Sequence, residues 1–150
     1  MYIEQVTTYT EELLEALQRL IPQLTTNNQP PDREGLIELI NSKASILVIA
    51  RNPIANSSII GAACLTVYRV PTGIRAIIED VIVDETSRGQ GIGEALVQKL
   101  LDIAREKGAK RVVLTSNPKR EAANRLYQRM GFKLRETNSY YFSFRDVRVS

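Results

Sequence analysis

The chain has 150 residues, a length that suits one domain with a single buried core. Its composition of 43% hydrophobic and 25% charged residues excludes a disordered or collagen-like chain. The net charge of +3, from 20 basic and 17 acidic residues, is too even to indicate a nucleic-acid-binding protein.

Cysteine and histidine are scarce. The chain has one cysteine, Cys64, and no histidine. One cysteine cannot form an internal disulfide. Histidine is the commonest general base and metal ligand, so without it we expect no bound metal. Cys64 lies in an apolar run and is expected to be a buried thiol. No apolar run is long enough to span a membrane and no secretory pattern is visible, so we expect a cytoplasmic protein of one domain, residues 1–150.

The first half of the chain predicts helices and then long strands. Thr10 and Asp32 are residue types that cap helices, and each precedes an apolar pattern of helical period. Helices are therefore expected over residues 11–20 and after Asp32. Strands are expected at residues 1–7, 45–50, 59–70 and 74–83. The last two are joined by a hairpin turn at residues 71–73.

The second half interleaves helices with short strands. A glycine-rich loop at residues 88–93 opens a helix near Gly91, which ends at Gly108. A strand at 111–115, a helix at 121–130 and strands near 132–134 and 140–144 follow. This order predicts an α/β protein with one mixed, mostly antiparallel sheet of about six to seven strands and about four flanking helices.

The glycine-rich loop predicts an anion site. Gly89, Gly91 and Gly93 let the backbone turn sharply and let a ligand approach the main chain. The first turn of the following helix has unpaired N–H groups and the positive end of the helix dipole, a combination suited to pyrophosphate. A tight turn without a ligand would have the same composition. A Walker loop is excluded, because Glu94 and Ala95 follow Gly93.

Two motifs then resemble the GNAT superfamily of N-acetyltransferases. Residues 83–93 look like its acetyl-CoA signature, with Arg88, Gly91 and Gly93 at the defining positions. Residues 122–132 are similar to its later helix, in which Leu126-Tyr127 precedes Gly131-Phe132. The similar part covers residues 59–144, and the first forty residues match only in the order of their elements.

The resemblance implies roles for particular residues. In this family a bulge splays the strand before the loop from the next strand, and pantetheine bonds to the backbone there, at Val81, Ile82 and Val83 in this chain. The pyrophosphate would rest on main-chain N–H groups of the loop and the helix start, with the Arg88 side chain in reach. These groups belong to Gly89, Gln90, Gly91, Ile92, Gly93 and Glu94.

Tyr127 occupies the position of the general acid that protonates the leaving thiolate in many members. On its helix alone it would be read as a core aromatic residue. Many members carry asparagine seven residues before this tyrosine, and Arg120 stands there instead. Arg120 and Asn124 are therefore further candidates for contacts with CoA.

Glu79 and Asp80 are the candidates for the base that deprotonates the acceptor amine. Because strand side chains alternate, Glu79 is expected to share a face with Ile77 and Val81, unless a bulge intervenes. A buried carboxylate has a raised pKa that suits a base, although a salt bridge stabilising the sheet is an alternative. We take Glu79 as the predicted base, and a water chain is the other option. The Glu-Asp pair resembles glucosamine-6-phosphate N-acetyltransferases and recurs in other members, so it leaves the acceptor open.

The expected function is acetyl transfer from acetyl-CoA to a primary amine, most simply that of a small molecule. The acidic residues of the two N-terminal helices would attract a cationic acceptor. Two alternatives are a protein lysine or N-terminal acetyltransferase and an acyl-CoA-binding module without turnover. The resemblance also makes a homodimer an expectation, because members of this family often form one.

Overall fold

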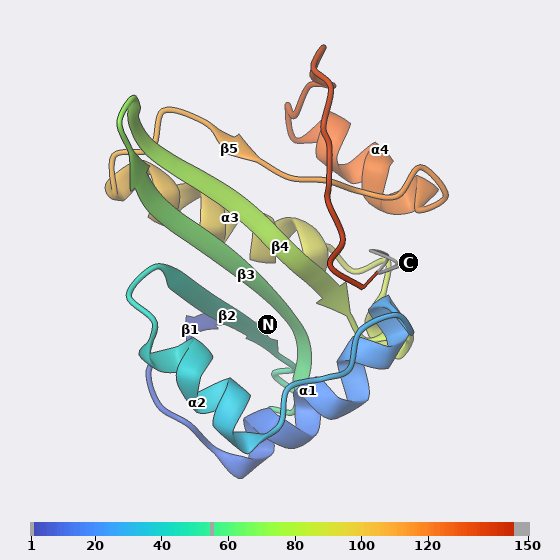
Figure 1. Ribbon diagram of the computed structural model, residues 1–150. Coiled ribbons are helices and arrows are strands. Elements are labelled where there is room, and N and C mark those ends of the chain that lie inside the picture. Colours follow the sequence, from blue (N-terminus) through green and yellow to red (C-terminus); the bar gives the residue numbers. More distant parts are fainter. Residues whose placement is uncertain (1, 55, 146–150) are drawn as a thin grey trace. The chain divides into compact units, whose positions relative to one another are not determined.

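The computed structural model describes residues 2–54 and 56–145 (Figure 1). Met1, which begins the first expected strand, and the last five residues of the expected domain lie outside the described residues. The chain divides into two units, one up to Asn117 and one from Pro118 onward.

Both N-terminal helices begin at the predicted caps. Helix α1 (Glu11–Leu24) starts after Thr10, whose hydroxyl accepts a hydrogen bond from the Leu13 N–H at 3.1 Å. Helix α2 (Arg33–Asn41) starts after Asp32, whose carboxylate accepts the Gly35 N–H at 2.8 Å. Helix α1 continues four residues beyond its expected end, although Pro22 lies in its last turn and offers no N–H.

The first unit contains a mixed five-stranded sheet in the order β1-β2-β3-β4-β5. The first three pairings are antiparallel, and β4 and β5 are parallel. The strands are β1 (Tyr2–Gln5), β2 (Ser45–Arg51), β3 (Ile59–Val70), β4 (Gly73–Val83) and β5 (Val112–Val113). Strands β3 and β4 form the predicted hairpin, in which Val70 pairs with Gly73 across Pro71 and Thr72.

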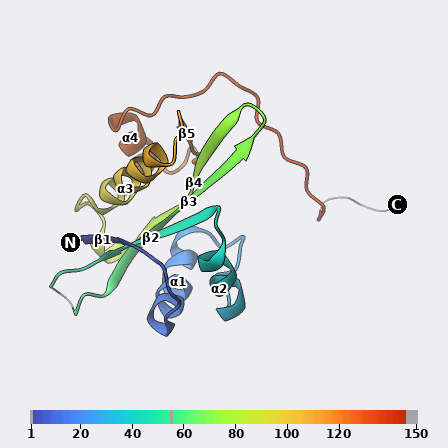
Figure 2. The ribbon, with the colours of Figure 1, turned by 90° about the vertical axis from the view of Figure 1, so that its left-hand side faces the viewer.

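Helices cover both faces of this sheet. Helices α1 and α2 lie on one face and α3 (Ile92–Glu106) lies on the other (Figure 2). The core beneath α1 and α2 includes Leu47, Ile49, Ala62 and Ile82, which alternate along their strands with residues of the opposite face. On α3, Leu96, Val97 and Leu100 are fully buried. Each helix of the described residues is too short or too polar to cross a membrane.

The second unit contains helix α4 (Glu121–Arg129). The chain turns just after this helix at Gly131, which has a φ of 101°. The strands predicted near 132–134 and 140–144 are wrong, because the described residues 132–145 contain no strand. Leu134, Tyr140 and Tyr141 are exposed there. Their aromatic and branched composition favours a strand, but a strand also requires a backbone partner, which composition does not supply. The described sheet therefore has five strands instead of six or seven.

Gly61 sets how closely the start of α3 approaches the sheet. A Cβ atom at this position would lie 3.0 Å from the Ile82 carbonyl oxygen and 3.1 Å from Leu96 Cδ1. We expect Gly61→Ala to lower the free energy of unfolding by about 1–3 kcal/mol, because backbone and packed helix must shift to admit the methyl group. Urea unfolding of the two proteins measures this. An unchanged midpoint would show that α3 is not held this closely.

Candidate active site

Strand β4 contains a bulge next to the predicted catalytic residues. Cys64 pairs with Glu79 and Ala62 pairs with Ile82, so two β4 residues, Asp80 and Val81, lie opposite the single β3 residue Ala63. Asp80 has a φ of 52°, a left-handed conformation that aspartate tolerates better than most residues. The bulge that the family resemblance implied is therefore present, and it begins at Asp80.

The bulge corrects two expectations about the carboxylates. Glu79 shares its face with Ile77 and Ile82 rather than with Val81, because the extra residue shifts the alternation by one. Glu79 and Asp80 are both exposed, whereas Val81 and Ile82 after them are both buried. An accessible carboxylate can meet a substrate from solvent, which a core carboxylate cannot.

Glu79 nevertheless has a perturbed acidity. Partial desolvation beside the strand raises its pKa, and the neighbouring Asp80 carboxylate raises it further. Burial also raises the pKa of the Cys64 thiol to about 11, and the charges of Asp80 and Glu79 contribute in the same direction. Cys64 is therefore a protonated thiol at neutral pH and a poor nucleophile.

The backbone of Val81, Ile82 and Val83 lies beyond the pairing of β4 with β5. In the described residues that parallel ladder joins only Ala76 to Val112 and Ile77 to Val113. On its other side the same segment pairs with β3, through Ile82 to Ala62 and Val83 to Gly61. The β5 side of Val81–Val83 therefore offers strand backbone outside a ladder, as the resemblance implied.

The loop after β4 forms an anion cradle at the start of α3. Gly89 and Gly91 have φ values of 78° and 79°, which explains why glycine occupies both positions. Gly91 is the N-cap of α3, and no side chain of the described residues caps the helix. A Cβ atom at Gly89 or Gly91 would meet no atom of the described residues within 4 Å, so the space that a side chain would enter there is open. The free N–H groups of the first helical turn and the dipole of a 15-residue helix suit an anion there.

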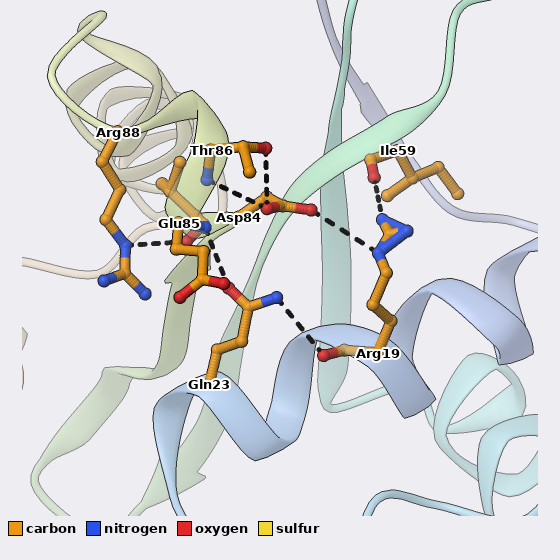
Figure 3. Close-up of polar contacts among 8 residues, drawn as sticks. Arg19, Gln23, Ile59, Asp84, Glu85, Thr86 and Arg88 are labelled. Atoms are coloured by element: carbon orange, nitrogen blue, oxygen red, sulfur yellow. Dashed lines mark hydrogen bonds and ion pairs between the residues drawn. The ribbon is translucent and has the colours of Figure 1, made fainter.

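The segment between β4 and this cradle is a short 3₁₀ helix, η1 (Glu85–Ser87), where the sequence pattern showed no helical signal. The Asp84 carboxylate accepts hydrogen bonds from the Thr86 N–H at 3.1 Å and the Thr86 hydroxyl at 3.0 Å. Arg88 folds back and donates through Nε to the Val83 carbonyl at 3.1 Å (Figure 3). Arg88 thus stabilises the loop by bonding back to the end of β4. This structural role is in addition to the phosphate contact that we expect of it.

The second motif lies on α4, in the second unit. Tyr127 is 6% exposed and packs edge-to-face against Phe132, with ring centroids 5.8 Å apart. Burial raises the pKa of Tyr127, and the positive charge of Arg120 acts against this. The Tyr-x₃-Gly-Phe spacing thus has a structural reason. The turn at Gly131 brings Phe132 back against the Tyr127 ring, and the Phe132 N–H donates a hydrogen bond to the Tyr127 carbonyl at 2.9 Å.

Arg120 and Asn124 belong to the first turn of α4. Arg120 is its N-cap, and its carbonyl accepts from both the backbone N–H of Asn124 at 3.0 Å and the side-chain Nδ2 at 2.8 Å. The Asn124 amide nitrogen therefore stabilises the start of the helix. Its proposed contact with CoA stays a prediction.

Sequence reasoning missed three residues that shape the loop: Arg19 and Gln23 of α1, and Asp84. Asp84 could have been identified by its position, because aspartate two residues before threonine commonly accepts the backbone N–H of that residue. Arg19 and Gln23 gave no local signal, since their partners in the loop, Asp84 and Glu85, lie 65 and 62 residues further along the chain.

The left-handed backbone at Asp80 gives a stability test of the bulge. We expect Asp80→Val to lower the free energy of unfolding by about 1–2 kcal/mol, because a β-branched side chain resists this conformation. Asp80→Asn should be nearly neutral. Glu79→Val, one residue earlier in ordinary strand backbone, is the matched control and should cost little. Chemical denaturation of the three variants measures this, and equal costs for Asp80→Val and Glu79→Val would contradict the bulge.

Comparisons with known proteins support the family resemblance. The sequence model described as the acetyltransferase (GNAT) family matches residues 10–132, so the match includes α1, which resembled the family only by element order. A glucosamine 6-phosphate N-acetyltransferase of Trypanosoma brucei brucei is 40% identical over 81 residues, which cover 52% of this chain and 53% of that protein. N-alpha-acetyltransferase 30 of Schizosaccharomyces pombe is 33% identical over 94 residues, 61% of this chain and 63% of the relative.

The solved structures give the same picture of the fold. The crystal structure of an acetyltransferase from Trypanosoma brucei superposes with a TM-score of 0.71 at 26% identity, over 95% of this chain and all of that one. The sequence matches themselves are shorter, and the chain spans about half the length of the first relative. Because the family's sequence model matches most of the chain, from the cap of α1 to the end of the second motif, the chain belongs to the acetyltransferase (GNAT) family.

Proposed function

We propose that this protein is an acetyl-CoA-dependent N-acetyltransferase that acetylates a primary amine of a small molecule by direct attack of the amine on the thioester. The observation that carries the proposal is the cradle formed by Gly89, Gly91 and the uncapped start of α3, with open space in front of it. We take residues 1–150 as one catalytic domain.

The residues of the first unit fit acetyl-CoA. The N–H groups of Gly89 to Glu94 would hold the pyrophosphate, and the backbone of Val81, Ile82 and Val83 outside the β5 ladder would hold the pantetheine amides. Bound acetyl-CoA would supply an acetyl group already activated as a thioester. The protein then has to place an amine against that carbonyl carbon and manage two protons.

Glu79 is the residue we assign to the first proton. Its carboxylate is exposed on β4, and its pKa is raised toward that of a useful base. It would accept a proton from the acceptor ammonium, so that the free amine attacks the carbonyl carbon. The Asp80 carboxylate beside it would favour the approach of a cation.

Tyr127 is assigned to the second proton on the strength of the second motif. As the new C–N bond forms and the C–S bond breaks, Tyr127 would donate its phenolic proton to the leaving sulfur. The nitrogen would give up its second proton on becoming an amide, and that proton would return to the Tyr127 phenolate through solvent. Its burial raises the pKa of the phenol and so favours the protonated form. The products are an amide and the free thiol of CoA.

A small-molecule acceptor is favoured by the relative that acts on glucosamine 6-phosphate. The acidic helices support a cationic acceptor less than their composition suggested, because Glu12 pairs with Arg51 at 2.8 Å and Asp32 caps α2. A protein N-terminal amine is the second candidate, supported by the similarity to N-alpha-acetyltransferase 30 over 61% of the chain. Comparing aminosugars with peptides as acceptors separates the two.

Calorimetric titration with CoA tests the cradle. We expect wild-type protein to bind with roughly micromolar affinity, and Gly91→Glu to weaken binding by about a hundredfold or more, because a carboxylate would occupy the anion position. Tyr127→Phe should bind as the wild type does, since its proposed role begins after binding.

Gly73→Glu is the matched control for this experiment. Gly73 also has a positive φ, 133°, and a Cβ atom there would meet no atom of the described residues within 4 Å, but it lies at the β3–β4 turn. The substitution adds the same charge at another positive-φ glycine and should leave CoA affinity unchanged. If the wild type binds no CoA, or if both glycine variants lose binding equally, the proposed cradle is wrong.

The pH dependence of kcat/KM tests Glu79. A base must be deprotonated, so the rate should rise with pH, with the midpoint of the acidic limb above the ordinary pKa of glutamate. Glu79→Gln should lower kcat/KM by about 10²-fold and remove that limb. Release of the CoA thiol, followed with the best acceptor from an amine panel, measures both.

Asp80→Asn is the control that separates the two neighbouring carboxylates. Because the Asp80 charge raises the pKa of Glu79, its removal should move the acidic limb to lower pH without abolishing that limb. A limb that survives in Glu79→Gln would assign the base to another group or to a water chain.

A further inference from the structure

Two side chains of α1 reach across to the segment that leads into the anion cradle (Figure 3). Arg19 Nε lies 3.5 Å from the Asp84 carboxylate, and Arg19 Nη2 donates to the Ile59 carbonyl at 2.6 Å. Gln23 Oε1 accepts the backbone N–H of Glu85 at 2.9 Å. Helix α1 therefore contacts both the side chain that caps η1 and the first residue of η1.

The remaining bonds of this segment are short-range or run to β3. The Asp84 N–H donates to the Ile60 carbonyl at 2.8 Å, the Ser87 N–H returns to the Asp84 carbonyl at 2.8 Å, and Arg88 returns to Val83. These bonds shape the turn itself. The contacts from Arg19 and Gln23 are the ones that fix the turn against a helix on the sheet face opposite α3.

The position of η1 determines the orientation of the backbone N–H groups that form the cradle. Gly89 follows Ser87 after a single residue, and both Gly89 and Gly91 are in conformations that give the chain a sharp turn. The side chain of Asp84 is only 14% exposed, so its pairing with Arg19 is better shielded than an ordinary surface ion pair, although Arg19 itself is 47% exposed. A small change in η1 would reorient the N–H groups that precede α3.

We propose that Gln23 and Arg19 are positioning residues for the anion cradle. They hold η1 so that the loop is in its binding conformation before the ligand arrives. This inference rests on the proposed function, in which the cradle binds the pyrophosphate of CoA. If a loop occupies its competent conformation for only part of the time, the apparent affinity falls by that fraction.

Gln23→Met tests this, because methionine keeps the length and helix propensity of glutamine but cannot accept the Glu85 N–H. Gln18→Met is the matched control, since Gln18 is an exposed glutamine of the same helix. We expect Gln23→Met to weaken CoA binding about three- to tenfold, the range expected for one neutral hydrogen bond, and Gln18→Met to leave it unchanged. Arg19→Met should weaken CoA binding at least as much.

Two further measurements distinguish positioning from a general loss of structure. Amide hydrogen exchange across residues 85–91 should be faster in Gln23→Met than in Gln18→Met, while exchange in β2 and β3 stays the same. Affinity for pantetheine, which lacks the pyrophosphate, should be equal in the two variants.

The outcomes separate this inference from the proposed function. Faster exchange at residues 85–91 with unchanged CoA affinity would reduce Gln23 to a structural contact and overturn the inference alone. An equal loss for CoA and pantetheine would do the same. A wild-type protein that binds no CoA would overturn both, whereas CoA binding without turnover would refute only the catalytic part of the proposed function.

Discussion

Strand β4 carries one residue more than β3 between their two stretches of regular pairing, and the candidate site depends on that residue. Asp80 takes up the extra length in a left-handed conformation, so the alternation of faces shifts by one from this point to the end of the strand. Before the shift, Glu79 and Asp80 are exposed. After it, Val81 and Ile82 are buried, and the backbone continues past the end of the β5 ladder. One irregularity thus separates the carboxylate that we assign as base from the strand edge that we assign to pantetheine.

The conformation of the chain after β4 is determined in stages. Asp84 caps a single turn of 3₁₀ helix, Arg88 bonds back to the end of the strand, and two left-handed glycines then start α3 without a side-chain cap. An uncapped helix start leaves N–H groups without partners, which is unfavourable unless water or an anion occupies the position. The stability of this loop therefore has to come from elsewhere. The contacts of Asp84 and Glu85 with α1, on the opposite face of the sheet, contribute to it.

In the proposed mechanism, a chain without histidine divides its acid–base chemistry between a carboxylate and a phenol. Both proposed groups have pKa values shifted by desolvation, in each case toward the protonated form. For Glu79 that shift strengthens a weak base, and for Tyr127 it keeps the donor protonated. Cys64 carries a thiol on the same strand pair. Burial and the charges of the two nearby carboxylates raise its pKa, so it is a poor nucleophile.

Local sequence signals were enough to predict most of the elements and the family. Helical period and the caps Thr10 and Asp32 located α1 and α2, the turn at residues 71–73 located the hairpin, and glycine spacing located the start of α3, because each of these depends on residues close together in the chain. The features that depend on distant partners emerged only from the folded chain. The aromatic segment 140–144 has strand composition but is not a strand among the described residues, since a ladder requires a second backbone. The face of Glu79 followed from its register with Cys64. The contacts of Arg19 and Gln23 with the loop depend on packing between residues 65 and 62 positions apart, Arg19 with Asp84 and Gln23 with Glu85.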